Sequence, residues 1–96
     1  MLMKEELSEI KILIDKGDAE GAISALSAFI SHQDNKELKS EAFYLLGNVH
    51  RKRGDWQMAL NNYLEAIELN PQSPAVHAKQ MLMDILNFYN KDMYNQ

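Results

Sequence analysis

The stretch that decides the fold runs from Ser40 to Pro71, SEAFYLLGNVHRKRGDWQMALNNYLEAIELNP. Its apolar residues recur every three or four positions in two blocks, which is the spacing of two amphipathic helices. Gly54 and Asp55 separate the blocks, because glycine accepts the left-handed turn that ends a helix and aspartate caps the next one. Pro71 ends the second block, since proline has no N–H to donate and restricts the residue before it. The stretch therefore predicts a helix, a tight turn and a second, antiparallel helix.

A glycine in the middle of the first of these helices predicts a close contact between the two. Gly47 costs about 1 kcal/mol relative to alanine at such a position, so its missing side chain must be useful. We expect the second helix to approach there, with Ala59 as the opposite surface. His50 shares a face with Gly47 and is expected to be a packed, hydrogen-bonded histidine rather than a ligand, because it lacks suitable partners.

This stretch resembles a tetratricopeptide repeat, a helix–turn–helix module of about 34 residues. The family pattern has a large aromatic residue, a Leu-Gly pair, further aromatic and alanine residues and a closing proline. The residues of this chain at those positions are Phe43, Leu46, Gly47, His50, Ala59, Tyr63, Ala66 and Pro71. Only His50 departs from the pattern, at a place where tyrosine is usual. The resemblance implies an all-α fold of antiparallel helix-turn-helix repeats, an α-α superhelix, with protein–protein interaction as its function.

The flanking sequence predicts a second, divergent repeat and a terminal helix. Two further helical patterns precede Ser40, separated by Gly17-Asp18, which repeats the Gly54-Asp55 turn 37 positions earlier. One more amphipathic pattern follows Pro71, and the tail after it is expected to fray. We expect about five helices in a single domain over residues 1–96, with a divergent repeat at 6–33, the well-matched repeat at 40–73 and a terminal helix at 74–89.

Composition and charge exclude several classes of function. The chain has 96 residues, of which 46% are hydrophobic and 25% charged, as in an ordinary soluble domain with one modest core. Its net charge of −4 disfavours a general nucleic-acid binder, which is usually basic. The absence of cysteine excludes disulfides and thiolate sites. No apolar run is long enough for a signal peptide or a membrane span, so we expect a cytoplasmic scaffold without a membrane partner.

No catalytic, metal or cofactor site is predicted. The histidines His32, His50 and His77 are scattered without metal-ligand spacing, and no HExxH motif occurs. The four glycines lie one by one, which excludes a glycine-rich phosphate loop. No serine lies in a G-x-S-x-G context. We therefore expect no enzyme activity, no cofactor and no metal.

The basic run Arg51-Lys52-Arg53 has two interpretations. It could be a nucleic-acid patch, but three cations without interleaved aromatic residues are weak support for that function. Cations in the last turn of a helix also offset the negative end of the helix dipole, and this is the interpretation that we favour. The prediction is therefore that nucleic acid is not a partner.

The face that carries Tyr44 and Asn48 points away from the predicted core. In tetratricopeptide repeat proteins this face lines a concave groove that binds peptides, and Asn48 matches a position where asparagine often holds the ligand. The resemblance thus implies a short groove for an acidic segment or a C-terminal carboxylate. A solvated helix face is the alternative, since such faces carry lysine and arginine anyway. The peptide-binding residues expected are Lys11, Tyr44, Asn48, Arg51, Lys52 and Lys79.

The terminal helix carries more apolar residues than the polar outer face of a capping helix would. Either the terminal residues fold back over it, or it contacts a partner protein or a second copy of this chain. The possible apolar interface comprises Met81, Leu82, Ile85, Phe88 and Tyr89. The sequence therefore predicts a non-catalytic module that binds a protein or peptide segment, with self-association as a homodimer as the alternative.

Overall fold

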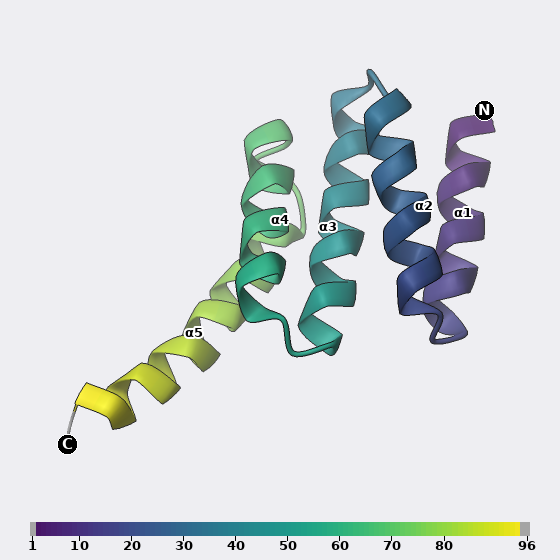
Figure 1. The fold of residues 1–96 in the computed structure, drawn as a ribbon. Helices are drawn as coiled ribbons and strands as arrows, with labels where there is room; N and C mark the ends of the chain where they lie inside the picture. Colours follow the sequence, from purple (N-terminus) through teal and green to yellow (C-terminus); the bar gives the residue numbers. More distant parts are fainter. Residues whose placement is uncertain (1, 95–96) are drawn as a thin grey trace.

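The computed structural model describes the backbone of residues 2–94 and the side chains of residues 5–88. This part of the chain forms five helices and no strand: α1 (Leu2–Asp15), α2 (Ala19–His32), α3 (Lys36–Lys52), α4 (Trp56–Leu69) and α5 (Ala75–Tyr94). Helices α1 to α4 are successively antiparallel and stand in a row, and α5 starts beside α4 and runs obliquely away from it (Figure 1). The expected all-α repeat architecture is confirmed.

The two Gly-Asp turns have nearly the same conformation. Gly17 and Gly54 adopt φ angles of 83° and 80°, the left-handed region in which glycine carries no steric cost. Asp18 and Asp55 follow them and cap α2 and α4, each accepting a hydrogen bond from the backbone N–H three residues ahead. The turns expected from the sequence therefore form at both positions, and each reverses the chain.

Two apolar clusters hold the row together, and α3 packs against both. The first joins α1, α2 and α3. The second joins α4 and α5, and Phe43 and Tyr44 of α3 pack against it. The buried members of the first are Leu7, Ile10, Leu26, Phe29, Ala42 and Leu46, and those of the second are Ala59, Tyr63, Ala66, Ala75 and Leu82. The central helix α3 is thus held by packing on two sides.

Gly47 lies at a close contact between α3 and α4, as expected, but its neighbour is not the one predicted. A Cβ atom at Gly47 would overlap the aromatic ring of Tyr63. The opposite surface is therefore Tyr63 and not Ala59. Tyr63 is completely buried, so its ring fills the space that a side chain at Gly47 would otherwise take.

His50 is packed against the turn, but the hydrogen bond expected for it is not formed. Its Nδ1 atom lies 3.8 Å from the nearer carboxylate oxygen of Asp55, which is too far for a hydrogen bond. Among the described side chains, this Nδ1 is a buried nitrogen without a hydrogen-bond partner. The prediction for His50 was therefore right about its packing and wrong about its bonding.

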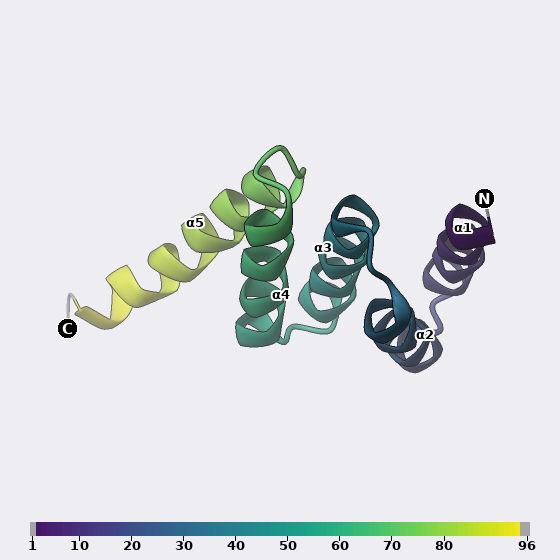
Figure 2. The same cartoon turned by 90° about the horizontal axis from the view of Figure 1, so that it is seen from above.

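The last helix leaves the row. Viewed from above, α5 starts beside α4 and then runs away from the other helices (Figure 2). It continues to Tyr94, so it is longer than the helix that was expected to end at residue 89. Because α5 is one continuous helix, this part of the chain does not fold back over its own apolar face. No helix in residues 2–94 is both long and apolar enough to cross a membrane.

Candidate functional site

The most informative cavity lies between α3 and α5, and we call it the α3–α5 groove. Its volume is about 200 Å³. One wall is the face of α3 that the sequence singled out, and the opposite wall is the start and middle of α5. The lining residues are Tyr44, Asn48 and Arg51 from α3, and Pro74, His77, Ala78, Met81, Leu82 and Ile85 from the α5 side. The groove therefore has a mixed α3 wall and a mainly apolar α5 wall.

Two of the predicted α3 residues are held by a buried tyrosine. The hydroxyl of Tyr63 donates a hydrogen bond of 2.6 Å to the side-chain oxygen of Asn48. The same hydroxyl accepts a bond of 3.2 Å from the Nε of Arg51. Burial raises the pKa of Tyr63 above its ordinary value of 10.0, and the bond from Arg51 partly opposes this. The phenol is thus neutral near pH 7, and it orders both neighbours.

The arrangement leaves useful donors facing the groove. Nε is the Arg51 atom that bonds Tyr63, and the terminal nitrogens of Arg51 have no hydrogen-bond or ion-pair partner among the described residues. Asn48 uses its oxygen for Tyr63, which leaves its amide N–H groups as donors. A guanidinium whose orientation is fixed in this way can bind a carboxylate through two parallel hydrogen bonds.

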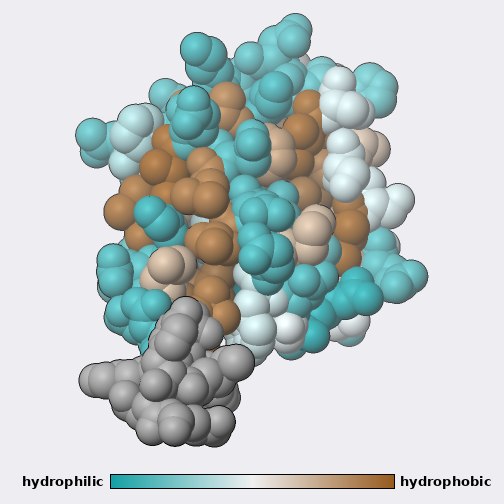
Figure 3. Space-filling view, turned by 60° about the vertical axis from the view of Figure 1, so that its left-hand side comes forward, coloured by the Kyte–Doolittle hydropathy of each residue, from teal (hydrophilic) through white to brown (hydrophobic). Residues whose placement is uncertain are grey.

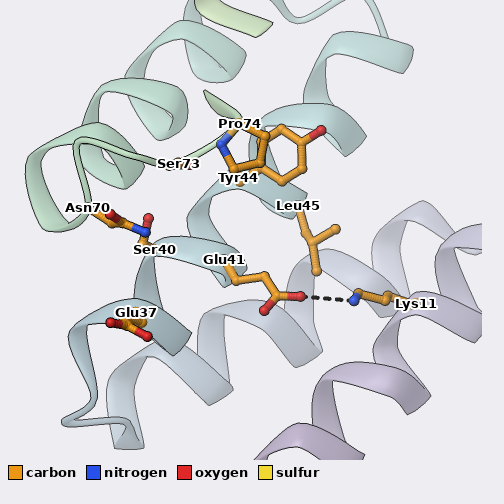
Figure 4. A pocket seen from close by; sticks show the side chains of 9 residues that line it. All are labelled: Lys11, Glu37, Ser40, Glu41, Tyr44, Leu45, Asn70, Ser73 and Pro74. Atoms are coloured by element: carbon orange, nitrogen blue, oxygen red, sulfur yellow. Dashed lines mark ion pairs between the residues drawn. The ribbon is translucent and has the colours of Figure 1, made fainter. Parts of the chain in front are cut away.

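A second cavity, of about 370 Å³, lies between α1, α3 and the segment that joins α4 to α5. Lys11 points into it from α1, but its ammonium forms an ion pair of 2.8 Å with Glu41 of α3 (Figure 4). Glu37 lines the same cavity. Lys11 therefore adds no net positive charge to this cavity, because its charge is matched by the carboxylate of Glu41.

Two other predicted residues, Lys52 and Lys79, lie outside the α3–α5 groove. Lys52 lines a small depression beside Ile14 and Gly17, at the turn between α1 and α2, instead of the groove. Lys79 is half-buried on α5 and lines neither of the two cavities. Both departures have one cause, since a step of one residue along a helix rotates the side chain by about 100°. The expected set thus reduces to Lys11, Tyr44, Asn48 and Arg51.

Only some residues of the predicted apolar interface of α5 are exposed. Leu82 is completely buried against α4, so it belongs to the core and its assignment to an exposed interface was wrong. Met81, Ile85 and Phe88 are exposed, and apolar surface gathers on the side of the molecule that carries α4 and α5 (Figure 3). The side chain of Tyr89 lies outside the described residues.

Sequence reasoning missed three residues that shape this site. Tyr63 was read only as part of the repeat pattern, although its hydroxyl orders the groove. His77 lines the groove opposite α3, and Glu41 neutralises Lys11. His77 lies at the place of Phe43 when α5 is aligned with α3 at the 34-residue repeat length, so the repeat pattern gave no signal that it lines the groove. The pairing of Glu41 with Lys11 joins two different helices and has no signal in the local sequence.

Comparisons with known proteins define the class. A family model described as tetratricopeptide repeat matches residues 40–73. The solution NMR structure of the Bacteroides fragilis protein BF1650 is 61% identical to this chain and superposes with a TM-score of 0.82. That match covers 94% of this chain and 89% of the other. A search among curated proteins finds no match.

The chain belongs to the tetratricopeptide repeat family. Proteins of this class stack short helical repeats into extended surfaces that bind other proteins. Its general function is therefore that of a protein–protein interaction module, whose partner is another protein. In the part of the chain whose side chains are described, no group of three histidine, aspartate or glutamate side chains is placed to hold a metal ion.

Proposed function

We propose that this chain is a non-catalytic interaction module that binds a protein or peptide segment in the α3–α5 groove, through a carboxylate of that segment. The observation that carries the proposal is the fixed guanidinium of Arg51, which Tyr63 holds at the edge of a cavity with an apolar opposite wall. A cation already ordered in the free protein loses little entropy on binding, which favours affinity.

The chemistry of the groove indicates what the bound segment carries. Arg51 and the amide of Asn48 supply hydrogen-bond donors on the α3 wall, and a carboxylate and a backbone carbonyl are their natural partners. Met81 and Ile85 supply apolar surface on the α5 wall. We infer a segment that presents an acidic group beside an apolar side chain. Lys11 contributes less than the sequence implied, because Glu41 shares its charge.

The proposal has further parts. Residues 1–96 act as one domain without a cofactor, in the cytoplasm, and neither nucleic acid nor a membrane is a partner. The acidic net charge of −4 supports the exclusion of nucleic acid. A second candidate function is self-association through α5, which is favoured by the exposure of Met81, Ile85 and Phe88.

The test is affinity capture from extract of the native cells, followed by mass spectrometry, with matched arginine variants. Arg51→Gln removes the groove cation and can still donate to Tyr63, whereas Arg53→Gln removes an exposed cation outside the groove. We expect Arg51→Gln to lose the partners that the unmodified chain and Arg53→Gln both retain.

Two controls keep this result interpretable. Circular dichroism and a thermal melt verify that the Arg51→Gln variant is folded. His77→Ala changes an exposed residue of the opposite wall and should also weaken capture without loss of stability. Full capture by both Arg51→Gln and His77→Ala would refute binding in the α3–α5 groove.

A further inference from the structure

Three exposed apolar side chains form a stripe along α5. Met81, Ile85 and Phe88 are spaced by four and three residues, so they lie on one side of the helix. Their exposed fractions are 52%, 38% and 65%, which is unusual for large apolar residues in a row. A different side of α5, with Ala75 and Leu82, packs against α4. The stripe is thus a second apolar face of the same helix.

This stripe lies on an electrically neutral part of an acidic chain. The whole chain has a net charge of −4. Residues 75–88 contain one lysine, Lys79, and one carboxylate, Asp84, so their formal charge is zero with histidine neutral. Two copies of an acidic protein repel each other least where the local charge vanishes. The stripe is therefore a surface on which a second copy meets no net charge from residues 75–88.

The length of α5 points to the same occupant. Leu86 is the last of its described side chains that packs against the core, yet the helix continues to Tyr94. Both ribbon views show this part standing clear of α1 to α4 (Figures 1 and 2). A helical segment of this length is marginal in water without packing. Packing against the same segment of a second molecule would bury this part of the helix.

We propose that a second copy of this chain covers the stripe with its own α5, in an antiparallel pair, and that the pairing closes the α3–α5 groove from the α5 side. Met81 and Ile85 belong to both the stripe and the groove wall, whereas Phe88 belongs to the stripe alone. A bound segment and the second copy then compete for the same two side chains. By linkage, self-association weakens segment binding and segment binding dissociates the dimer. This competition rests on the proposed function, and the dimer does not.

The dimer is tested by sedimentation at micromolar concentration. We expect a dimer mass for the unmodified chain and a monomer for Phe88→Glu, with the dissociation constant raised about 30-fold or more by a charge in the interface. Ile12→Glu is the matched control, because Ile12 is 51% exposed on α1, far from the stripe, and should leave the dimer intact. A monomeric unmodified chain would overturn the inference, as would a dimer that Phe88→Glu leaves unchanged.

The closing of the groove is tested with single thiols, since the chain contains no cysteine. Ile85→Cys should give a covalent dimer on mild oxidation, and Ile12→Cys should not. A thiol at His77→Cys reports access to the groove through its rate of reaction with dithionitrobenzoate. We expect that rate to rise severalfold when Phe88→Glu is added. An equal rate in both backgrounds would show that the dimer leaves the groove open, which rejects the competition.

The two proposals fail separately. Loss of capture in Arg51→Gln depends on a residue of α3 that lies outside the stripe, and the oligomeric state depends on α5. A chain that is monomeric but captures partners through Arg51 would keep the proposed function and reject the dimer. A dimer whose capture is insensitive to Arg51 would do the reverse.

Discussion

Replacing Gly47 with alanine tests the contact on which the α3–α4 pair depends. In an ordinary helix this substitution stabilises the fold, because alanine has the better helix propensity by about 1 kcal/mol. Here the new Cβ would overlap the ring of Tyr63. The ring cannot withdraw freely, since its hydroxyl is bonded to Asn48 at 2.6 Å and to Arg51 at 3.2 Å. The steric clash therefore lowers the free energy of unfolding of the variant, whereas the better helix propensity raises it.

The magnitude follows from these opposing terms. Overpacking of a filled core costs about 1–3 kcal/mol. Because movement of Tyr63 would also strain two hydrogen bonds of about 1 kcal/mol each, we expect the upper part of that range. Subtracting the propensity gain of about 1 kcal/mol leaves a net loss of about 2 kcal/mol. For a domain of this size, that is a substantial share of the free energy of unfolding.

Urea unfolding followed by circular dichroism measures this loss. The midpoint for Gly47→Ala should fall while the slope m stays unchanged. The control is the same substitution in a Tyr63→Leu background, in which the ring is absent and Gly47→Ala should be neutral or stabilising. If Gly47→Ala alone were as stable as the unmodified chain, the ring of Tyr63 would not lie against Gly47 and the packing argument would be refuted.

Two other predictions concern Tyr63 and α5. Burial raises the pKa of Tyr63 above 10.0, so the folded state holds the phenolic proton more tightly than the unfolded state. The resulting stability is complete below pH 10.0 and is lost as the pH rises through the folded pKa. The urea midpoint should therefore fall as the pH is raised above 10.0, and fall less in Tyr63→Phe. On α5, Leu82→Ala should cost about 3 kcal/mol, because Leu82 is fully buried, whereas Met81→Ala should change the stability of the monomeric state by no more than about 0.5 kcal/mol. Equal losses in urea unfolding of the two variants, measured in a Phe88→Glu background, would contradict the assigned orientation of α5.

The parts of the fold that the sequence predicted are those set by local chemistry. Gly17 and Gly54 take the left-handed turn because few other residues can, and the aspartates after them cap the next helix. The helical periodicity requires only the spacing of apolar residues along one element. Each of these signals lies within a short stretch of sequence. The five helices and their order could therefore be predicted without knowledge of how the helices pack.

The errors concern how one helix is rotated against another. The apolar residues of α5 cover more than half of its circumference, so its pattern is compatible with burying either Met81 or Leu82. The structure buries Leu82 and exposes Met81. The same uncertainty explains Lys52 and Lys79, which were expected in the groove and do not line it. Pairing between helices, as in Lys11 with Glu41, depends on this rotation and on the distance between helices. Neither the rotation of a helix nor the distance between helices follows from the spacing of apolar residues within one helix.

Tyr63 shows that the residues of the repeat pattern are not separate from the proposed binding face. Its ring can lie close to α3 because Gly47 has no side chain there. That closeness brings its hydroxyl within reach of Asn48 and Arg51, which it fixes toward the groove. A missing methyl group on α3 thus determines the direction of a guanidinium one turn further along the same helix. The pattern residues therefore fix the orientation of the α3 wall. In the proposed function, the choice of partner then depends on the opposite wall, which His77, Met81 and Ile85 line.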